Sequence, residues 1–370
     1  MPTPDNNSAK EKWIGTPIDD LDTPSLLLDR PASDRNIRKM ADFFHGRKSQ
    51  LRPHFKNHKC ATLAQRQLAA GSAVGITCAK LGEAEVLAEH GVGDILIANQ
   101  VVGRHKMDRF VEVARRTDLK VAVDEIGQAE AISEAASAAG VTVGILVEVD
   151  IGMGRCGVPA GEPALELARA ISPLQGLRFD GIQAYEGHAV YVNDLAERTE
   201  RVRQSFEMAL ETRRLLEQNG IPVKVISGGS SSTYQITGAI DGVDEIQAGS
   251  YPTLDWRYAQ MLPEFEVALS IVTRVISKRP GAAVLDVGLK GAGCEFGPPR
   301  IKGVSEAEIP SFSSEEHCIV QSVPDWKVGD AVEILPSHAC TTCNLYRAMY
   351  VHEDGRVVDV WPIEASGRLT

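Results

Sequence analysis

The stretch DILIANQVVGRHKMDRFVEVARRTDLKVAVDEIGQAEAISEAASAAGVTVGILVEVD (residues 94–150) decides the fold of this 370-residue chain. Three short apolar runs lie in it, DILIAN (94–99), KVAVD (120–124) and VGILVEVD (143–150), separated by longer stretches of helical pattern. Short buried strands that alternate with helices are typical of βα units, which build a parallel sheet. The stretch therefore predicts an α/β domain.

The same alternation continues on both sides of this stretch, from about residue 50 to residue 250. The five further runs are LRPHFK (51–56), VGITCA (74–79), FDGIQAY (179–185), VKVISGG (223–229) and DEIQAG (244–249). Eight β/α units over about 200 residues favour a closed (β/α)8 TIM-type barrel. An open doubly wound sheet is the alternative, but the first turn lacks its GxGxxG loop. We assign the barrel to residues 21–257, behind an N-terminal tail over 1–20.

The last third of the chain has a different pattern. Runs such as AAVLDVGL (282–289) and DAVEILPS (330–337) alternate or are β-branched, and Gly, Pro and Asp separate them. This pattern predicts an all-β domain over residues 258–370. The early run SLLLD (25–29) is a candidate strand of the same domain.

Composition limits the class of protein. The chain has 39 Lys and Arg against 50 Asp and Glu, a net charge of −11, which argues against nucleic acid or an anionic membrane as partner. No run approaches the ~20 apolar residues of a membrane span, and the start lacks a signal-peptide core, so we expect a cytoplasmic protein. Seven cysteines, an odd number scattered through a large chain, indicate reduced thiols.

In such a barrel the reactive groups lie where the strands end. The first strand ends in RPHFKNHK, and strand alternation places Arg52, His54 and Lys56 on one face. If that face lines the barrel, partial burial lowers the pKa of Lys56 and prepares its amine for Schiff-base chemistry. A solvated basic loop is the alternative interpretation of the same residues.

Two small loops follow the seventh and eighth strands, SGGSSST (227–233) and AGSY (248–251). Gly- and Ser-rich loops at these two places are where barrels bind phosphate, through backbone N–H groups and hydroxyls. Together with a lysine on the first strand, they indicate a phosphorylated carbonyl cofactor, and pyridoxal 5'-phosphate fits.

Three other positions carry candidate chemistry. Arg155 lies in the turn VDIGMGRCG after the fifth strand and is a candidate partner of the cofactor or of a substrate carboxylate, or else a surface arginine. The sixth strand ends in QAYEGH, which offers Tyr185 and His188. In LPSHACTTCN, His338 and Cys340 are two residues apart, so on a strand both face one side and can bind one metal ion, with zinc favoured.

These motifs resemble the pyridoxal-phosphate family of D-threonine aldolase and eukaryotic-type D-serine dehydratase, an alanine racemase-like barrel with a β-domain. The resemblance rests on RPHFKNHK, VEVDIGMGRCGV, GIQAYEGH, SGGSSST, EIQAGSY, LDVGLK, LPSHACTTCNL and VVDVWPIEASGR, and covers nearly the whole chain from TPSLLLD onward. The sequence departs from the family's common motifs where KTHK is KNHK, with Asn57 as the second residue.

The resemblance assigns a role to each matched residue. It implies that Lys56 rather than Lys59 is the Schiff-base lysine, that His338 and Cys340 hold a divalent zinc or manganese ion, and that His188 is a candidate proton carrier. The residues it implies for cofactor binding are Lys56, Arg155, Tyr185, Gly228, Gly229, Ser230, Ser231, Gly249, Ser250 and Tyr251.

The resemblance implies a lyase of D-β-hydroxy-α-amino acids but leaves the broken bond open. The family's aldolases carry His-x-Asp and its dehydratases His-x-Cys, whereas the running text RPHFKNHKCATLAQRQLA looks more like the bacterial aldolases. We expect retro-aldol cleavage to glycine and an aldehyde. Dehydration of D-serine or D-3-hydroxyaspartate to a keto acid and ammonia is the first alternative, and amino-acid racemisation the second. The resemblance also implies a head-to-tail homodimer, in which the β-domain of one subunit closes the site of the other.

Overall fold

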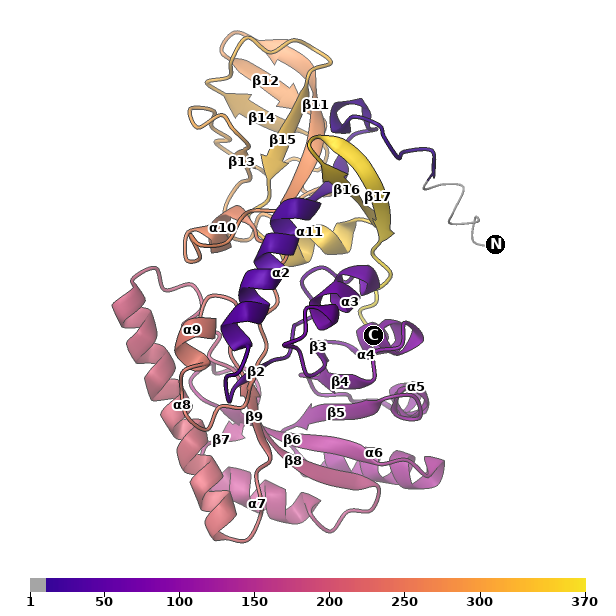
Figure 1. Ribbon diagram of the computed structural model, residues 1–370, viewed down its shortest axis with the longest axis vertical. Helices are drawn as coiled ribbons and strands as arrows, with labels where there is room; N and C mark the ends of the chain where they lie inside the picture. The colour runs from indigo at the N-terminus through magenta and orange to yellow at the C-terminus, as the bar shows by residue number, and fades with distance from the viewer. Residues whose placement is uncertain (1–10) are drawn as a thin grey trace. The chain divides into compact units, whose positions relative to one another are not determined.

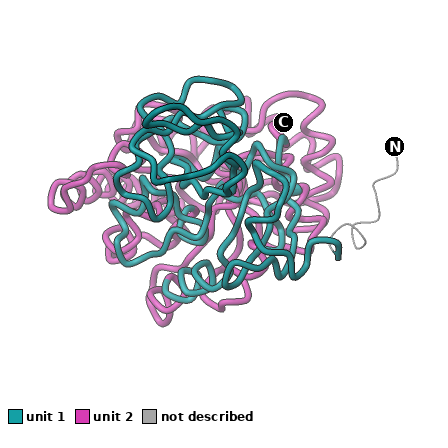
Figure 2. Tube along the Cα trace, turned by 90° about the horizontal axis from the view of Figure 1, so that it is seen from above, with its two compact units in different colours: residues 1–39, 57–62, 250–367 teal, residues 40–56, 63–249, 368–370 magenta. Residues whose placement is uncertain are grey.

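The computed structural model describes residues 11–370, so the first half of the predicted tail lies outside the described residues. The chain forms two compact units (Figure 2). Unit 1 contains the described residues up to Lys39, together with Asn57–Thr62 and Ser250–Gly367. Unit 2 contains Met40–Lys56, Leu63–Gly249 and Arg368–Thr370.

Unit 2 is the barrel that the sequence predicts (Figure 1). Its eight parallel strands lie in the order β2-β10-β9-β8-β6-β5-β4-β3, and the short β7 (Val158–Pro159) pairs beside β6. Parallel bridges from Leu51 to Ala73 and from His54 to Thr77 join the first and last strands of this order and close the sheet. The eight strands are β2 (Gln50–Leu51), β3 (Ile76–Cys78), β4 (Asp94–Ile97), β5 (Asp118–Val123), β6 (Val143–Asp150), β8 (Leu177–Ala184), β9 (Val225–Gly228) and β10 (Glu245–Ile246).

A helix follows each strand before the next, as right-handed βα crossovers require. The helices are α3 (Ala61–Ala69), α4 (Leu81–Glu89), α5 (Arg104–Ala114), α6 (Ile126–Ala139), α7 (Glu162–Ile171), α8 (Leu195–Gln218) and α9 (Tyr234–Thr237). Local sequence sets their ends. Asp194 caps α8 by accepting the Glu197 N–H at 2.7 Å, and Gly140, with φ 66°, ends α6 in the left-handed conformation.

A network of charged side chains fills the end of the barrel where the strands begin. Arg52 is buried, and its guanidinium donates to both oxygens of Glu245 at 2.7 Å and to Asp94 at 2.6 Å. Lys120 on β5 donates to Asp94 at 2.9 Å and to Asp118 at 2.7 Å. We call this the barrel floor; its further members are Arg178, Asp180 and Lys224.

The first barrel strand is shorter than the sequence predicts. Strand alternation predicts that Arg52, His54 and Lys56 lie on one face of that strand. In the structure β2 contains Gln50–Leu51 alone, and the chain beyond His54 is a run of turns. Arg52 therefore belongs to the ion network at the start of the strands, and Lys56 lies four residues further along, where the strands end.

Unit 1 is built on a mostly antiparallel sheet in the order β13-β15-β11-β1-β16-β17, with β12 pairing with β11 and β14. β1 (Ser25–Asp29) pairs antiparallel with β11 and parallel with β16, so the early run belongs to this sheet. The other strands are β11 (Leu269–Arg279), β12 (Ala282–Leu285), β13 (Arg300–Ile301), β14 (Cys318–Gln321), β15 (Ala331–Leu335), β16 (Ala348–Glu353) and β17 (Arg356–Pro362). Two short helices, α10 (Trp256–Ala259) and α11 (Ala339–Leu345), add to it, and α2 (Arg30–Phe44) leads from this unit into the barrel.

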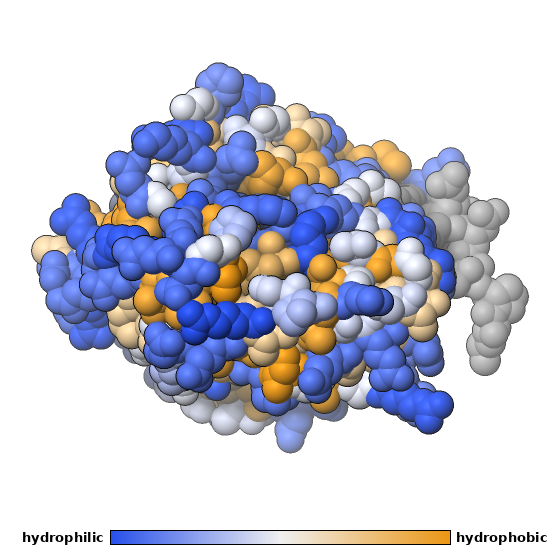
Figure 3. Space-filling model, turned by 90° about the horizontal axis from the view of Figure 1, so that it is seen from below, coloured by the Kyte–Doolittle hydropathy of each residue, from blue (hydrophilic) through white to orange (hydrophobic). Residues whose placement is uncertain are grey.

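The described part of the predicted tail contacts this sheet. The Trp13 ring meets the Tyr350 ring edge-on at 5.7 Å, and the Gly15 N–H donates to the Val357 carbonyl at 2.8 Å. η1 (Ile18–Asp20) follows, and Ile18 joins Leu27 and other buried residues in a core cluster. In residues 11–370 no helix has the length and apolar character to cross a bilayer. On the face shown in Figure 3, hydrophobic side chains form small areas among hydrophilic ones.

Candidate active site and metal-ligand pair

Three predicted residues meet at the ends of the barrel strands. Tyr185 directly follows β8, and the Lys56 Nζ atom lies 5.7 Å from the centroid of its ring. The Arg155 guanidinium lies 5.6 Å from the same centroid. These distances are within the range of cation–π attraction. Two cations from different strand ends therefore approach one aromatic ring.

The turn that carries Arg155 is organised by Asp150, the last residue of β6. Its carboxylate accepts the N–H groups of Gly152 at 2.9 Å and of Gly154 at 3.1 Å. Burial raises the pKa of Asp150, but these backbone hydrogen bonds outweigh burial and hold it below its usual value. Both glycines have positive φ, 113° and 63°, a backbone that other residues adopt at a cost. The glycine-flanked turn thus fixes where Arg155 leaves the strand end.

A buried carboxylate lies beside this turn. Glu148 on β6 accepts a hydrogen bond from Gln100 at 2.6 Å and shares a small hollow with Arg155, Cys156 and Tyr185. Burial raises the pKa of Glu148, and the charge of Arg155 opposes that rise. The hollow therefore has polar groups of both signs next to the Tyr185 ring.

Glu186 accepts hydrogen bonds from the first predicted phosphate loop. This residue is fully buried, and it is not among the candidate residues predicted from the sequence. Its carboxylate accepts the Gly229 N–H at 3.1 Å and the hydroxyls of Thr233 and Thr237 at 2.6 and 3.1 Å. Burial raises its pKa against these hydrogen bonds. The Gly229 N–H is therefore engaged by Glu186, and phosphate binding by the remaining groups of this loop stays a prediction.

The serines of this loop are buried and mutually bonded. The Ser230 hydroxyl lies 3.3 Å from that of Ser232 and 3.0 Å from Thr233 Oγ1, and Ser231 is 1% exposed. At Gly228 an added Cβ would lie 1.8 Å from the Ala184 carbonyl oxygen, so this position accepts no side chain. Close packing of the loop on β8 is therefore enough to explain why a glycine stands at position 228, whether or not the loop binds phosphate.

The second predicted loop divides between the two units. Gly249 belongs to the barrel, where an added Cβ would lie 3.0 Å from His54. Ser250 and Tyr251 belong to unit 1; the Ser250 carbonyl accepts the Leu254 N–H at 2.7 Å, and the fully buried Tyr251 ring lies 6.4 Å from that of Phe265.

His188 is exposed and lies over the glycine-flanked turn. Its Nε2 atom is 3.3 Å from the Ser205 hydroxyl on α8, and its Cε1 atom is 3.0 Å from where a Cβ of Gly152 would be. Burial and the charge of Arg201 lower the pKa of His188, with Asp150 opposing. The ring is therefore neutral at neutral pH and able to accept a proton.

The predicted metal ligands lie together in unit 1, but not on a strand as the sequence indicated. β15 ends at Leu335, and His338 is the extended N-cap residue of α11, which contains Cys340. The reason is Asp255, a buried carboxylate that accepts the Ala339 N–H at 3.0 Å and so starts the helix after Pro336 and Ser337. The His338 imidazole nevertheless interacts with the Cys340 side chain.

The residues around this pair fit a divalent metal ion. His338 Nδ1 is buried without a hydrogen-bond partner, and it lies 3.5 Å from a Glu295 carboxylate oxygen without suitable geometry for one. Burial lowers the pKa of His338, but Cys340, Glu295 and Asp255 outweigh burial and raise it to about 9. Imidazole nitrogen, thiolate sulfur and carboxylate oxygen are the donors of zinc sites. Among residues 11–370 no set of three or more such side chains forms a complete ligand cluster.

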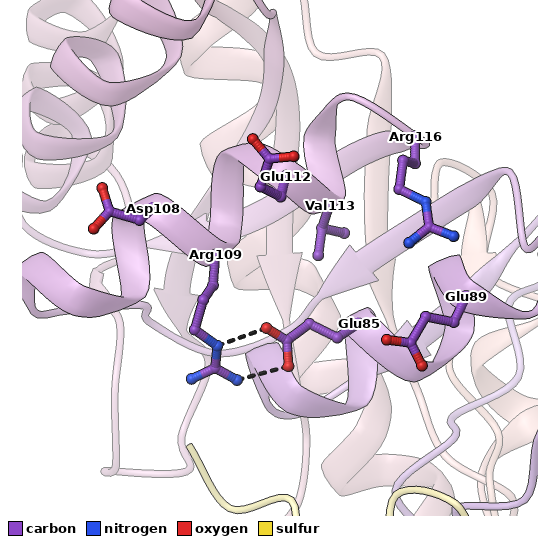
Figure 4. Close-up of a pocket in the computed structure, with 7 residues that line it drawn as sticks. All are labelled: Glu85, Glu89, Asp108, Arg109, Glu112, Val113 and Arg116. Carbon is purple, nitrogen blue, oxygen red and sulfur yellow. Dashed lines mark hydrogen bonds and ion pairs between the residues drawn. The ribbon is translucent and has the colours of Figure 1, made fainter.

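A hollow on the outside of the barrel, between α4 and α5, is not a second candidate (Figure 4). It is lined by four carboxylates, two arginines and Val113. Arg109 forms a two-point ion pair with Glu85 at 2.6 and 2.7 Å, and Arg116 donates to the Ala88 carbonyl. The arginines are thus engaged in holding the helices together, away from the strand ends.

The parallel barrel and the separate sheet domain together are the architecture of alanine racemase-like enzymes. Residues 28–253 match the family model described as alanine racemase, N-terminal domain, and residues 268–352 match the putative serine dehydratase domain. The D-threonine aldolase of an Arthrobacter species is 37% identical over 361 residues, 95% of each chain. The chain belongs to the alanine racemase-like family of D-threonine aldolases and D-serine dehydratases, a family of pyridoxal-phosphate-dependent lyases.

Solved structures agree with this assignment. The D-threonine aldolase of Filomicrobium marinum superimposes with a TM-score of 0.93 at 36% identity, covering 96% of this chain and 98% of that one. The D-threo-3-hydroxyaspartate dehydratase of Delftia sp. HT23 gives a TM-score of 0.85 at 28% identity, covering 94% and 98%. A variant of D-threo-3-hydroxyaspartate dehydratase with a cysteine replaced by alanine has been solved in a metal-free form.

Proposed function

We propose that this protein is a pyridoxal-phosphate- and metal-dependent lyase that cleaves D-β-hydroxy-α-amino acids into glycine and an aldehyde. The observation that carries the proposal is the approach of Lys56 and Arg155 to the ring of Tyr185 at the strand ends. When bound, the cofactor supplies an electron sink for charge that develops at the substrate Cα.

The chain's own barrel residues have distinct tasks in this proposal. Lys56 holds the cofactor through its amine, and Arg155, fixed by the Asp150 turn, is the cation for the cofactor's phenolic oxygen or the substrate carboxylate. Tyr185 packs beside the cofactor ring, and the loops at 228–231 and 249–251 hold its phosphate. His188 is the proton carrier, because its lowered pKa leaves a neutral imidazole at neutral pH.

The metal ion in the proposal is zinc or manganese on His338 and Cys340. When bound, it supplies a Lewis acid that makes the substrate's β-hydroxyl easier to deprotonate. The buried, unpartnered Nδ1 atom of His338 and the adjacent thiol support this assignment. Thiolate and imidazole together favour zinc over manganese, since sulfur is the softer donor.

A dehydratase is the second candidate function, and one observation favours it. His338 and Cys340 form the His-x-Cys pair of the family's dehydratases, where its aldolases carry His-x-Asp. In that reaction the Cα proton is removed, the β-hydroxyl leaves, and the product hydrolyses to a keto acid and ammonia. Racemisation inverts the configuration at Cα and breaks no bond to Cβ. It is the third outcome to distinguish.

Product analysis separates these reactions. The cofactor-loaded, metal-loaded protein is incubated with D-threonine, D-serine and D-3-hydroxyaspartate, and amino acids, aldehydes, keto acids and ammonia are measured. We expect glycine and acetaldehyde in equal amounts from D-threonine. Keto acid with ammonia would replace the aldolase by the dehydratase, and formation of the L-isomer alone would indicate a racemase. Light scattering of the same sample tests the proposed homodimer.

A further inference from the structure

Asn57 is a buried polar residue that none of the proposed chemistry uses. It is 1% exposed and belongs to unit 1, where its side-chain N–H donates to the sulfur of Cys340 at 3.5 Å. Its carbonyl oxygen accepts the Thr253 hydroxyl at 2.6 Å, and Thr253 is also fully buried. The chain Thr253, Asn57, Cys340 therefore ends on a sulfur that the proposed function assigns to a metal ion.

The direction of these two hydrogen bonds matters. Because the Thr253 hydroxyl donates to Oδ1, it fixes the amide with its N–H groups toward the sulfur. An N–H donor stabilises a negatively charged sulfur, whereas the amide oxygen in the same place would repel it. Burial strengthens the preference, since no water is available to replace the donor. The pocket around Cys340 is thus arranged for a thiolate.

We infer that Asn57 is a positioning residue for the metal site, an inference that rests on the proposed metal function of His338 and Cys340. Asn57 holds the Cys340 thiolate in one orientation and withdraws part of its charge through the N–H to sulfur bond. Such partners of metal ligands change metal affinity by about 10–100-fold when they are removed. Asn57 directly follows Lys56 in the motif RPHFKNHK. One motif therefore contains both the proposed cofactor lysine and a hydrogen-bond donor to the proposed metal ligand Cys340.

The test uses Co²⁺ as the probe in the full-length, cofactor-loaded protein. Co²⁺ bound to a thiolate gives a ligand-to-metal charge-transfer band, which is read as a difference spectrum against the metal-free protein. For Asn57→Leu we expect Co²⁺ affinity to fall about 10-fold or more. We also expect the band to move to longer wavelength, because a sulfur without the N–H bond gives up electron density more easily.

A second variant and a matched control keep the outcome specific. Thr253→Val keeps the shape but removes the hydroxyl that orients Asn57, so its band should move the same way by a smaller amount. Asn36 is equally buried, 1% exposed, and makes two hydrogen bonds to Glu266 in the same unit. Asn36→Leu should leave both affinity and band unchanged.

The two levels of the proposal fail differently. If His338→Ala keeps the wild-type affinity and band, the metal site itself is misplaced and the proposed function loses its metal. If His338→Ala removes the band while Asn57→Leu and Thr253→Val leave affinity and wavelength unchanged, only the role of Asn57 is refuted. An equal loss of affinity in Asn57→Leu and Asn36→Leu would also overturn it, because general loosening of the unit would then explain both.

Discussion

The two ends of the barrel place their cations in different surroundings. At the floor, cations and carboxylates meet in direct pairs: Arg52 with Glu245 and Asp94, and Lys120 with Asp94 and Asp118, at 2.6 to 2.9 Å. At the strand ends, Lys56 and Arg155 lie 5.7 and 5.6 Å from the centroid of the Tyr185 ring.

We propose that this difference separates residues that stabilise the barrel from residues that take part in the reaction. Buried cations that carboxylates hold in fixed pairs close the bottom of a barrel, and they cannot turn toward a ligand without breaking those pairs. Lys56 and Arg155 lie near one aromatic ring, and we propose that both act on an anionic group bound there. The predictions below test whether the two ends separate in this way.

The largest effect is expected at Lys56. Lys56→Ala should abolish turnover and the visible absorption of the bound cofactor, because no amine remains to hold it. Lys120→Ala, the matched lysine of the floor, should keep the absorption and turn over at a comparable rate. Borohydride reduction followed by peptide mapping provides the measurement. A reduced lysine adduct that persists in Lys56→Ala would move the assignment to Lys59.

Removal of the metal should be the next largest effect. Chelation, or Cys340→Ala, should eliminate cleavage of D-threonine while the cofactor absorption stays at its wild-type value. The reason is that Lys56 and the loop at 228–231 belong to the barrel unit, whereas His338 and Cys340 belong to unit 1. Activity and absorbance are recorded on the same samples, with zinc added back. Full activity in the chelated protein would contradict the metal-assisted reaction.

The sequence was enough to predict the barrel because all eight strand runs carry their own signal. Each of the eight runs overlaps one of the eight parallel strands, and β6 follows VGILVEVD residue for residue. Five runs contain their strand in full, two begin two residues late, and LRPHFK shares only Leu51 with β2. The spacing of His338 and Cys340 made them candidate metal ligands and the resemblance implied that role, which stays a prediction. Their helix was missed, because the residue that starts α11 is Asp255, 84 positions away from Ala339. Glu186 was hidden for the same reason: it stands in the quoted QAYEGH, but its partners at 229, 233 and 237 are brought to it by folding alone.

At the floor, the expected effect is on stability. Arg52→Met leaves Glu245 and Asp94 partly buried with fewer partners, and breaking a buried pair from one side costs about 3 kcal/mol. We therefore expect a lower midpoint in urea, with the rate on D-threonine in the native range unchanged. Lys48→Met is the control, since its pair with Asp241 is about 90% exposed on both sides and contributes little. Equal midpoints for the two variants would refute the role of the floor.

The smallest expected effect is on stability in acid, at Asp118, a partly exposed member of the barrel floor. Burial raises the pKa of Asp118, but hydrogen bonds from Lys120 and Arg178 outweigh burial and hold it below its usual value. A carboxyl whose folded pKa lies below the unfolded value of about 3.9 stabilises the protein above that pH and loses this contribution as the pH falls through the folded pKa. Asp118→Asn should therefore be less stable than wild type at pH 7, and the two should converge once the pH has fallen below the folded pKa of Asp118.

Thermal unfolding of both proteins between pH 7 and the acid limit measures this convergence, in low salt because the Asp118 side chain is 45% exposed. Asp241→Asn, whose carboxylate is 89% exposed, should follow the wild type at every pH. A difference for Asp118→Asn that stays constant with pH would mean that packing rather than charge stabilises this position. In that case the floor would resemble an ordinary polar core, and its contrast with the strand ends would rest on Arg52 alone.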